Sequence, residues 1–183
     1  MTDMTRTTVP VWDPLVRLFH WSLVAAFAIA WLTADELDRI HEWSGYVAGG
    51  LVAFRLLWGL IGPRHARFSQ FVRSPAAVGQ YLRDILRGRE RRFVGHNPAG
   101  AAMILALLAI TAMTATTGWM TTLDVYWGIK WVEDVHEIMA NLMIVMVAIH
   151  VTGVALTSLR HRENLVRAMI VGRKRAPSGT DID

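Results

Sequence analysis

The chain contains no cysteine among its 183 residues. Disulfide bonds, thiolate metal sites, iron–sulfur clusters and covalent haem attachment through a C-x-x-C-H motif are therefore excluded. Charged residues are also scarce, at 19% of the chain, where a soluble domain carries about 25%. Any cofactor must consequently be held non-covalently by His, Met or carboxylate side chains, and the shortage of charge indicates a lipid environment.

The basic character of the chain does not indicate a nucleic-acid partner. The net charge is +4 and the pI is about 10.1, but nucleic-acid-binding proteins carry such charge on a soluble fold with aromatic platforms or a reading helix. Here the basic residues lie between long apolar runs, and 53% of the residues are hydrophobic. This segregation is typical of a membrane protein, so we expect the lipid bilayer as a partner and no nucleic acid.

Four apolar stretches are long enough to cross a bilayer, which takes roughly 20 mostly apolar residues per helix. They cover residues 15–34, 41–61, 98–123 and 135–159. Backbone polar groups in lipid must be satisfied within the protein, so all four are expected to be helices. Asn97 and Pro98 supply an N-cap and a first-turn proline for the third. The predicted fold is an all-α, integral membrane four-helix bundle.

The distribution of charge orients this bundle. Basic residues precede the first stretch, crowd the loop between the second and third, and follow the fourth: Arg6 and Arg17; Arg64, Arg67, Arg73, Arg83, Arg87, Arg89, Arg91 and Arg92; and Arg160, Arg162, Arg167, Arg173, Lys174 and Arg175. The other two loops are mostly acidic, with Asp35, Glu36, Asp38, Asp124, Glu133 and Asp134 against Arg39 and Lys130. By the positive-inside rule, both termini and the central loop are cytoplasmic. This predicts a multi-pass membrane protein whose two termini lie on the same side.

The segments outside the apolar stretches give the domain layout. In the central loop, apolar residues recur at helical spacing opposite the arginines, which predicts an amphipathic helix on the inner membrane surface; they are Val78, Tyr81, Leu82, Ile85 and Leu86. One domain is expected over residues 1–172, and the charged tail, residues 173–183, is predicted to be disordered. Alternatively, "LFHWSLVAAFAIA" is a cleaved signal peptide, but His20 and Trp21 interrupt its apolar run and cleavage would leave three spans.

Four of the seven histidines pair by their expected depth. His20 and His150 lie toward the cytoplasmic ends of the first and fourth stretches, whereas His41 and His136 open the second and fourth on the outer side. The step from His136 to His150 advances a helix by about 21 Å and returns to the same face. His41 with His136 therefore forms an outer pair, and His20 with His150 an inner pair. Two imidazoles from facing helices are the axial ligands that a haem iron requires in a helix bundle.

Other interpretations of these histidines account for their number and spacing less well than haem ligation does. Zinc would require a third or fourth ligand at each pair; Glu42 and Glu137 adjoin the outer pair, so an outer metal site stays open. Four histidines in two depth-matched pairs argue against four independent interfacial residues. His161 is a rival inner ligand, because it lies 11 residues after His150 on the same face, but within the charged "RHREN" segment. His65 and His96 are expected at the level of the lipid headgroups.

Arg55 is the only charge deep in a predicted span. It lies 14 residues after His41, hence on the same face at the depth of the inner pair, where an unpaired guanidinium would cost several kcal/mol. We expect it to pair with a haem propionate, with Arg17 as a second partner; snorkelling to a lipid phosphate is the alternative. Glycines near the ligand-bearing faces would let a porphyrin approach or serve helix packing; they are Gly45, Gly49, Gly50 and Gly153.

Several segments of the sequence resemble one family. "WDPLVRLFHW", "IHEWSGYVAGGLVAFRLLWG", "GHNPAG" and "VHEIMANLMIVMVAIHVTGVALTSLRHRENLVRAM" are similar to the bacterial cytochrome b561 family, in particular its branch of nickel-iron hydrogenase cytochrome b subunits. The resemblance covers about residues 10–172. It implies a four-helix cytochrome of the bacterial inner membrane with two non-covalent b haems, in which His20, His41, His136 and His150 match the family's axial ligands. The loops are short and no extra domain is fused, so the resemblance does not assign the redox partner.

The residues and the resemblance together predict a transmembrane electron conduit. We expect transfer between a periplasmic partner, either a hydrogenase iron–sulfur subunit or a c-type cytochrome, and the quinone pool. The acidic and aromatic loop "DVYWGIKWVED" is the expected docking site for that partner. Whether the chain acts as a simple carrier or as the cytochrome b subunit of an oxidoreductase complex stays open, as does a homodimer. The alternatives are a haem-free membrane anchor and a His-based divalent-metal carrier, and an optical spectrum separates all three.

Overall fold

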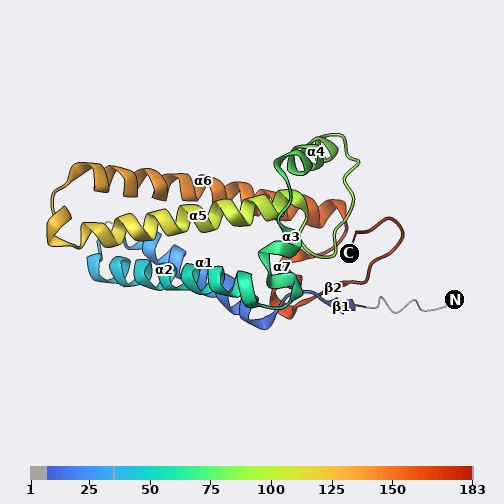
Figure 1. Ribbon diagram of the computed structural model, residues 1–183, viewed down its shortest axis with the longest axis horizontal. Coiled ribbons are helices and arrows are strands. Elements are labelled where there is room, and N and C mark those ends of the chain that lie inside the picture. The colour runs from blue at the N-terminus through green and yellow to red at the C-terminus, as the bar shows by residue number, and fades with distance from the viewer. Residues whose placement is uncertain (1–7, 35, 183) are drawn as a thin grey trace. The chain divides into compact units, whose positions relative to one another are not determined.

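The computed structural model describes residues 8–34 and 36–182, so Arg6 and Asp35 of the charge argument lie outside the described residues. Four long helices dominate the structure (Figure 1): α1 (Pro14–Leu32), α2 (Asp38–Ile61), α5 (Pro98–Thr121) and α6 (Lys130–Arg160). All four are long and apolar enough to cross a membrane. The prediction of a mostly helical chain with four membrane-length helices is confirmed, while the cytoplasmic location of the termini stays a prediction.

Polar caps set where two of the long helices begin. The Asp13 carboxylate accepts hydrogen bonds from the backbone N–H groups of Leu15 and Val16 at 2.9 and 3.1 Å, ahead of α1. The Asn97 side chain accepts one from the Gly100 N–H at 2.7 Å, so the predicted N-cap of α5 is confirmed. Each cap satisfies backbone donors that have no partner inside the helix.

The helix α6 begins at Lys130, earlier than the predicted residue 135, and follows the short helix η2 (Asp124–Tyr126). Its first turn contains Glu133, and acidic side chains are favourable at the positive end of a helix dipole. Lys130 also pairs with Asp134 one turn later, with 2.7 Å between Nζ and Oδ1. These polar residues lengthen α6 beyond its apolar stretch, which is why hydropathy alone places the start too late.

The chain divides into two compact units. The helical unit comprises residues 18–58 and 105–149, and the loop unit comprises residues 1–17, 59–104 and 150–183. In the helical unit, small residues bring helices together: a Cβ added at Gly49 of α2 would lie 3.4 Å from the Cβ of Ala115 on α5. On α5, the Thr111 hydroxyl bonds back to the Leu107 carbonyl at 2.7 Å. Close small-residue packing and internally satisfied hydroxyls are features of helices in lipid.

The apolar surface of the long helices faces outward. Only 6–28% of the most apolar window of each one is buried. Large side chains such as Leu18, Leu57 and Ile149 are exposed along them. A soluble protein rarely exposes apolar patches of such extent, so this surface belongs against lipid and the chain is a multi-pass membrane protein.

The loop unit holds the short elements. They are β1 (Thr8–Pro10), η1 (Arg64–Ala66), α3 (Phe68–Phe71), α4 (Pro75–Leu86), α7 (Leu165–Val171) and β2 (Arg173–Arg175). The helix α4 coincides with the predicted amphipathic segment and is capped by Ser74, whose hydroxyl accepts a hydrogen bond from the Ala77 N–H at 3.3 Å. Its Tyr81 is buried, whereas Leu86 is 86% exposed. The position of α4 on the membrane surface stays a prediction.

The C-terminal tail, predicted to be disordered from residue 173, is ordered in the structure through residue 182. Strand β2 pairs antiparallel with β1, with Lys174 opposite Val9. Further along, the Ile182 N–H donates to the Arg92 carbonyl at 2.9 Å. The prediction of disorder is wrong here because it counts the tail's charges as solvated, whereas several of them have partners in the loop unit.

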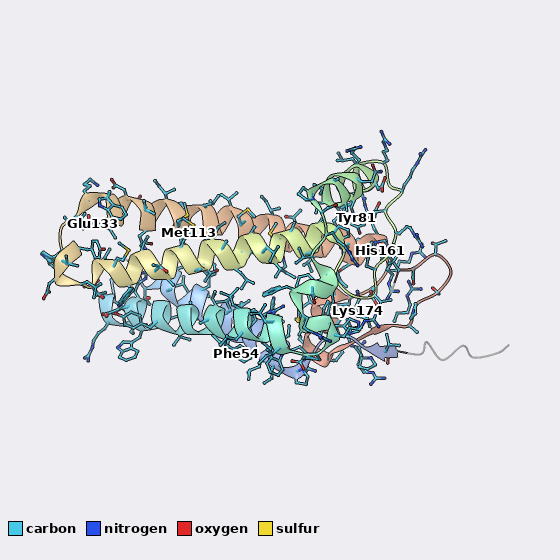
Figure 2. The ribbon with its side chains drawn as sticks, viewed as in Figure 1. Phe54, Tyr81, Met113, Glu133, His161 and Lys174 are labelled. Carbon is cyan, nitrogen blue, oxygen red and sulfur yellow. The ribbon has the colours of Figure 1, made fainter. Side chains whose placement is uncertain are left out.

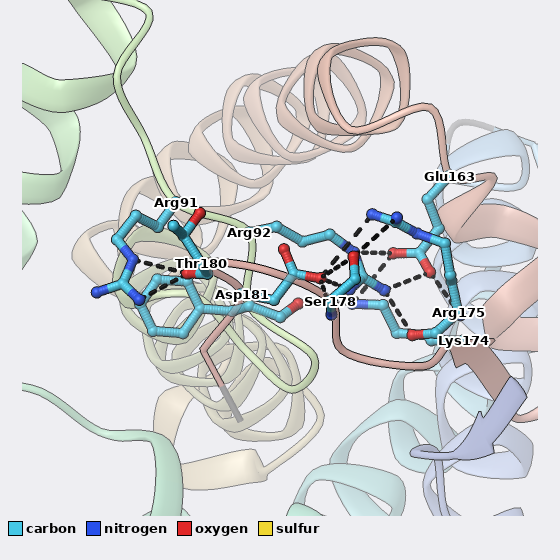
Figure 3. A network of polar contacts seen from close by, with 9 residues as sticks. Arg91, Arg92, Glu163, Lys174, Arg175, Ser178, Thr180 and Asp181 are labelled. Atoms are coloured by element: carbon cyan, nitrogen blue, oxygen red, sulfur yellow. Dashed lines mark hydrogen bonds and ion pairs between the residues drawn. The ribbon is translucent and has the colours of Figure 1, made fainter. Parts of the chain in front are cut away.

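Those partners form a buried ionic network around Arg92, called the Arg92 network below (Figure 3). The Arg92 guanidinium, with its side chain 4% exposed, contacts Glu163 Oε1 at 2.8 Å and Asp181 Oδ2 at 2.7 Å. Lys174 Nζ lies 3.6 Å from Glu163 Oε2 and donates to the Phe93 carbonyl at 3.0 Å. The network therefore ties the tail to the central loop and to the segment that follows α6.

The pKa values of the network follow from burial and pairing. Burial alone would raise the pKa of Glu163, but hydrogen bonds from Arg92 and the Arg175 N–H, together with the charge of Lys174, hold it below its usual range. Burial lowers the pKa of Lys174 to about 8, because the attraction of Glu163 only partly offsets it and the positive charge of Arg92 acts in the same direction as burial. Arg92 is thus the cation on which the two carboxylates chiefly depend.

Removing that cation should release the tail. We expect Arg92→Met to destabilise the loop unit by about 3–5 kcal/mol, because breaking a buried ion pair strands the remaining charges without compensation. Hydrogen exchange at the Val94 and Ile182 amides, which are hydrogen-bonded in the structure, measures the effect. Arg89→Met, at an exposed position of the same loop, is the control; equal exchange in the two variants contradicts the assignment.

Acid should release the wild-type tail in the same way. The pKa values of Glu163 and Asp181 are lowered in the fold, so their stabilising contribution is present above their ordinary pKa of about 4 and is lost as the pH falls through the lower folded values. Exchange at the Ile182 amide should rise over that range in the wild type and change little in Arg92→Met.

Candidate functional site

The helical unit brings His41 and His136 together. Their ring centroids are 6.0 Å apart and the ring planes meet at 82°. His41 lies in the first turn of α2 and His136 in the second turn of α6, and both are half-buried. The two histidines expected to share the outer depth are therefore neighbours in space.

Backbone carbonyls of neighbouring helices hold both rings. Nδ1 of His41 lies 2.8 Å from the Ala30 carbonyl oxygen on α1, and Nδ1 of His136 lies 3.0 Å from the Thr114 carbonyl oxygen on α5. A carbonyl only accepts, so Nδ1 must carry the proton, and in a neutral ring Nε2 then keeps its lone pair. Histidines that ligate metals are oriented in this way, by donating the other ring N–H to a carbonyl.

A glycine that the sequence reasoning missed fits against His136. A Cβ added at Gly118 of α5 would lie 2.9 Å from Cε1 of His136 and 3.2 Å from its Nδ1. The ring therefore occupies space that any other residue would take. The Thr117 hydroxyl, 3.4 Å from Nδ1, lies beside the same ring. The signal in the sequence is a glycine within an uncharged helix, and nothing in the sequence indicates which side chain packs against it.

The two inner histidines lie in different units, His20 in the helical unit and His150 in the loop unit, so their pairing stays a prediction. His20 is half-buried, with its ring 5.0 Å from that of Trp21 at a near-perpendicular angle. His150 is also half-buried and lies on α6, the helix that carries His136.

The two arginines expected beside a cofactor also lie in different units. Arg55 of α2 is only 2% exposed, which places a charged side chain inside the helical unit as predicted. Arg17 of α1 packs against Gly172: a Cβ there would lie 2.5 Å from Nη1 of Arg17. Their contact with propionates stays a prediction.

Of the four glycines expected near the ligand-bearing faces, Gly49 lies against Ala115, where an added Cβ would be at 3.4 Å, and so serves helix contact. Within residues 8–34 and 36–182, no neighbouring atom lies within 4 Å of a Cβ added at the other three, Gly45, Gly50 and Gly153.

His161, the rival inner ligand, lies one residue beyond the end of α6 (Figure 2). Burial lowers its pKa, opposed by Glu90, and charged groups of the Arg92 network act on it as well. This charged environment is unlike the apolar setting of a haem ligand. Among the described residues there is also no group of three or more His, Asp or Glu side chains that could hold a metal ion, and Glu42, expected near an outer metal site, accepts the Tyr46 hydroxyl at 2.7 Å.

The arrangement defines a class of protein: a multi-helix membrane protein with paired, carbonyl-oriented imidazoles on α2 and α6, a kind of side chain that can hold a non-covalent haem. Residues 11–172 match the family of prokaryotic cytochrome b561 proteins. The chain belongs to that family, and membership implies membrane electron transfer by a b-type haem.

Two relatives cover most of the chain. A protein of Bradyrhizobium diazoefficiens, described as a probable Ni/Fe-hydrogenase B-type cytochrome subunit, is 24% identical over 92% of this chain and 87% of its own length. A protein of Rhodobacter capsulatus with the same description is 27% identical over 92% of this chain and 82% of its own length. No solved structure matches the chain.

The Gly118 contact yields a test of the site. Gly118→Ala should displace the His136 ring and lower the haem absorbance per chain or shift its reduced α-band, because the new methyl group would lie 2.9 Å from Cε1. Gly79→Ala, on α4 of the loop unit, is the control, since a Cβ there would meet only the end of the Arg83 side chain, at 4.0 Å, in the described part of the chain. An unchanged reduced spectrum in Gly118→Ala, with Gly79→Ala also unchanged, would show that the ring does not depend on this space.

Proposed function

We propose that the chain carries electrons across the membrane through two b haems, one held by His41 and His136 and the other by His20 and His150. The observation that carries the proposal is the outer pair, whose rings lie 6.0 Å apart with each Nδ1 hydrogen-bonded to a carbonyl. Two metal–nitrogen bonds of about 2 Å plus the two ring radii also give roughly 6 Å between centroids. The spacing therefore suits one metal between the two rings.

The protein's part is to hold ligands and exclude water. The Ala30 and Thr114 carbonyls fix the protonated nitrogens of His41 and His136 and so direct their lone pairs. The apolar helices keep the dielectric low, and Arg55 supplies a buried positive charge for an acidic cofactor group. A bound haem supplies reversible one-electron transfer. His150 follows His136 by about 21 Å along α6, which supports two separate sites along one helix.

The proposed partners rest on three observations: the charge of the loops, the exposure of apolar side chains near the start of α6, and the descriptions of the two relatives. The basic loops support a bacterial inner-membrane location with both termini inside, and the relatives are described as hydrogenase cytochrome subunits. We propose a hydrogenase as the periplasmic partner, with a c-type cytochrome as the alternative, and the quinone pool as the partner in the membrane. The loop before α6 and the first turn of α6 support outer docking, because Val125, Trp127 and Trp131 are 75%, 81% and 55% exposed.

Two alternatives explain less of the structure. A haem-free membrane anchor would not require two neighbouring imidazoles, each oriented by a backbone carbonyl. A divalent-metal carrier would require a larger donor set than two histidines, and the described residues contain no such group.

Substitution of each histidine tests the two pairs. The wild type should yield two b haems per chain by the pyridine haemochrome method. His41→Ala and His136→Ala should each remove the same haem, and His20→Ala and His150→Ala the other, because loss of one axial imidazole leaves the iron half-ligated. The reduced spectrum of each variant identifies the haem that is lost.

His161→Ala is the control, and both haems should remain in it. If His161→Ala removed a haem that His150→Ala leaves in place, the inner ligand would be His161. If variants within one pair removed spectrally different haems, the pairing by depth would be wrong.

Arg55 should tune the inner haem. A buried positive charge opposes the extra positive charge of ferric iron, so Arg55→Leu should lower the midpoint potential of the inner haem and spare the outer one. A redox titration that resolves the two haems measures the shift. Arg55→Lys keeps the charge but loses the bidentate fork, so its potential should stay nearer the wild type. Unchanged potentials in Arg55→Leu, with full haem content, would mean that Arg55 has no electrostatic role at the cofactor.

A further inference from the structure

A pocket of about 200 Å³ lies in the loop unit. Its polar lining comes from η1, from α3 and the residues just after it, and from the stretch before α5: Arg64, His65, Ser69, Gln70, Arg73 and His96. Phe71 adds an aromatic wall, and its ring lies 4.4 Å from that of His96, which also contacts Trp12 at 4.6 Å between centroids. The His96 ring is thus fixed between two aromatic side chains.

The lining is cationic and contains no carboxylate. The ion pairs of the described residues use Arg92, Arg160, Arg175, Lys130 and Lys174 as their cations. Within residues 8–34 and 36–182, neither Arg64 nor Arg73 forms an ion pair, and both are exposed. Two guanidinium groups at one pocket can each offer a planar fork of donors to an oxyanion, and Ser69 and Gln70 add neutral donors.

The position of the pocket places it at the membrane boundary. Arg64 comes three residues after α2 ends at Ile61, and His96 comes two residues before α5 begins at Pro98. Both helices are of membrane-spanning length, so the residues that adjoin these ends lie at the level of the lipid headgroups. Basic pockets at this level bind anionic headgroups.

We infer that this pocket binds a phosphate group. Its volume is below the roughly 300–1,000 Å³ of pockets for drug-sized ligands, so it suits one small charged group and not a whole nucleotide or quinone. The phosphate belongs either to an anionic phospholipid headgroup or to free phosphate. The inference does not rest on the proposed haem sites.

The test uses the haem-loaded protein in neutral detergent, stripped of lipid, with two probes. Inorganic phosphate is titrated by calorimetry, and phosphatidylglycerol is added before native mass spectrometry counts the retained lipid. Arg64→Gln/Arg73→Gln should weaken binding of the effective probe by about tenfold or more, because two charge-assisted contacts are lost. Arg87→Gln/Arg89→Gln removes the same charge from exposed positions of the same loop outside the pocket and should leave binding within about threefold.

Each outcome decides the inference. Pocket-dependent retention of phosphatidylglycerol identifies a lipid headgroup, and pocket-dependent binding of inorganic phosphate alone identifies free phosphate. An equal loss in both double variants would mean diffuse charge attraction and overturn the site, as would a wild type that binds neither probe. The haem spectrum confirms that each variant is folded, and Arg64→Lys/Arg73→Lys, which keeps the charge without the fork, should fall between the wild type and the glutamine variant.

Discussion

A polar group surrounded by lipid has to find its partner inside the protein, and most of this structure depends on that constraint. It makes the four long segments helical and turns threonine hydroxyls back onto their own helices, as at Thr111. It also acts on the histidines. The ring N–H of His41 would be costly in an apolar unit, and the Ala30 carbonyl accepts it at 2.8 Å. The bond that satisfies this donor also directs the other nitrogen, so the requirement for a partner and the orientation of a ligand are met by one contact.

The same constraint separates the charges of the chain. Ionic side chains that are buried yet paired gather in the loop unit, where Arg92, Glu163 and Asp181 compensate one another. Arg55 is buried in the helical unit, at 2% exposure. A buried cation in a membrane-spanning helix indicates a functional site, and an acidic cofactor group is the contact that the proposed function assigns to it.

Much of the fold could be predicted from the sequence, because apolar run length and helix caps are local signals. The Asn97 cap and the four helices follow from neighbouring residues alone. The outer pair could also be predicted, since helical rise converts sequence position into depth. The ordered tail could not, because the contact between Arg92 and Asp181 joins residues 89 positions apart and nothing local marks it. Gly118 was missed for the same reason: its role is visible only once His136 lies against it.

The acceptors that orient the two outer imidazoles are main-chain carbonyls, those of residues 30 and 114. Every amino acid carries such a carbonyl, so the side chains at these positions can change in the course of evolution without removing the acceptor, provided that the helices remain. A side-chain acceptor would instead tie each orienting position to one or two residue types. The orientation of the two imidazoles can therefore persist while the residues at positions 30 and 114 change. In an alignment of diverged family members, neither position needs to be conserved.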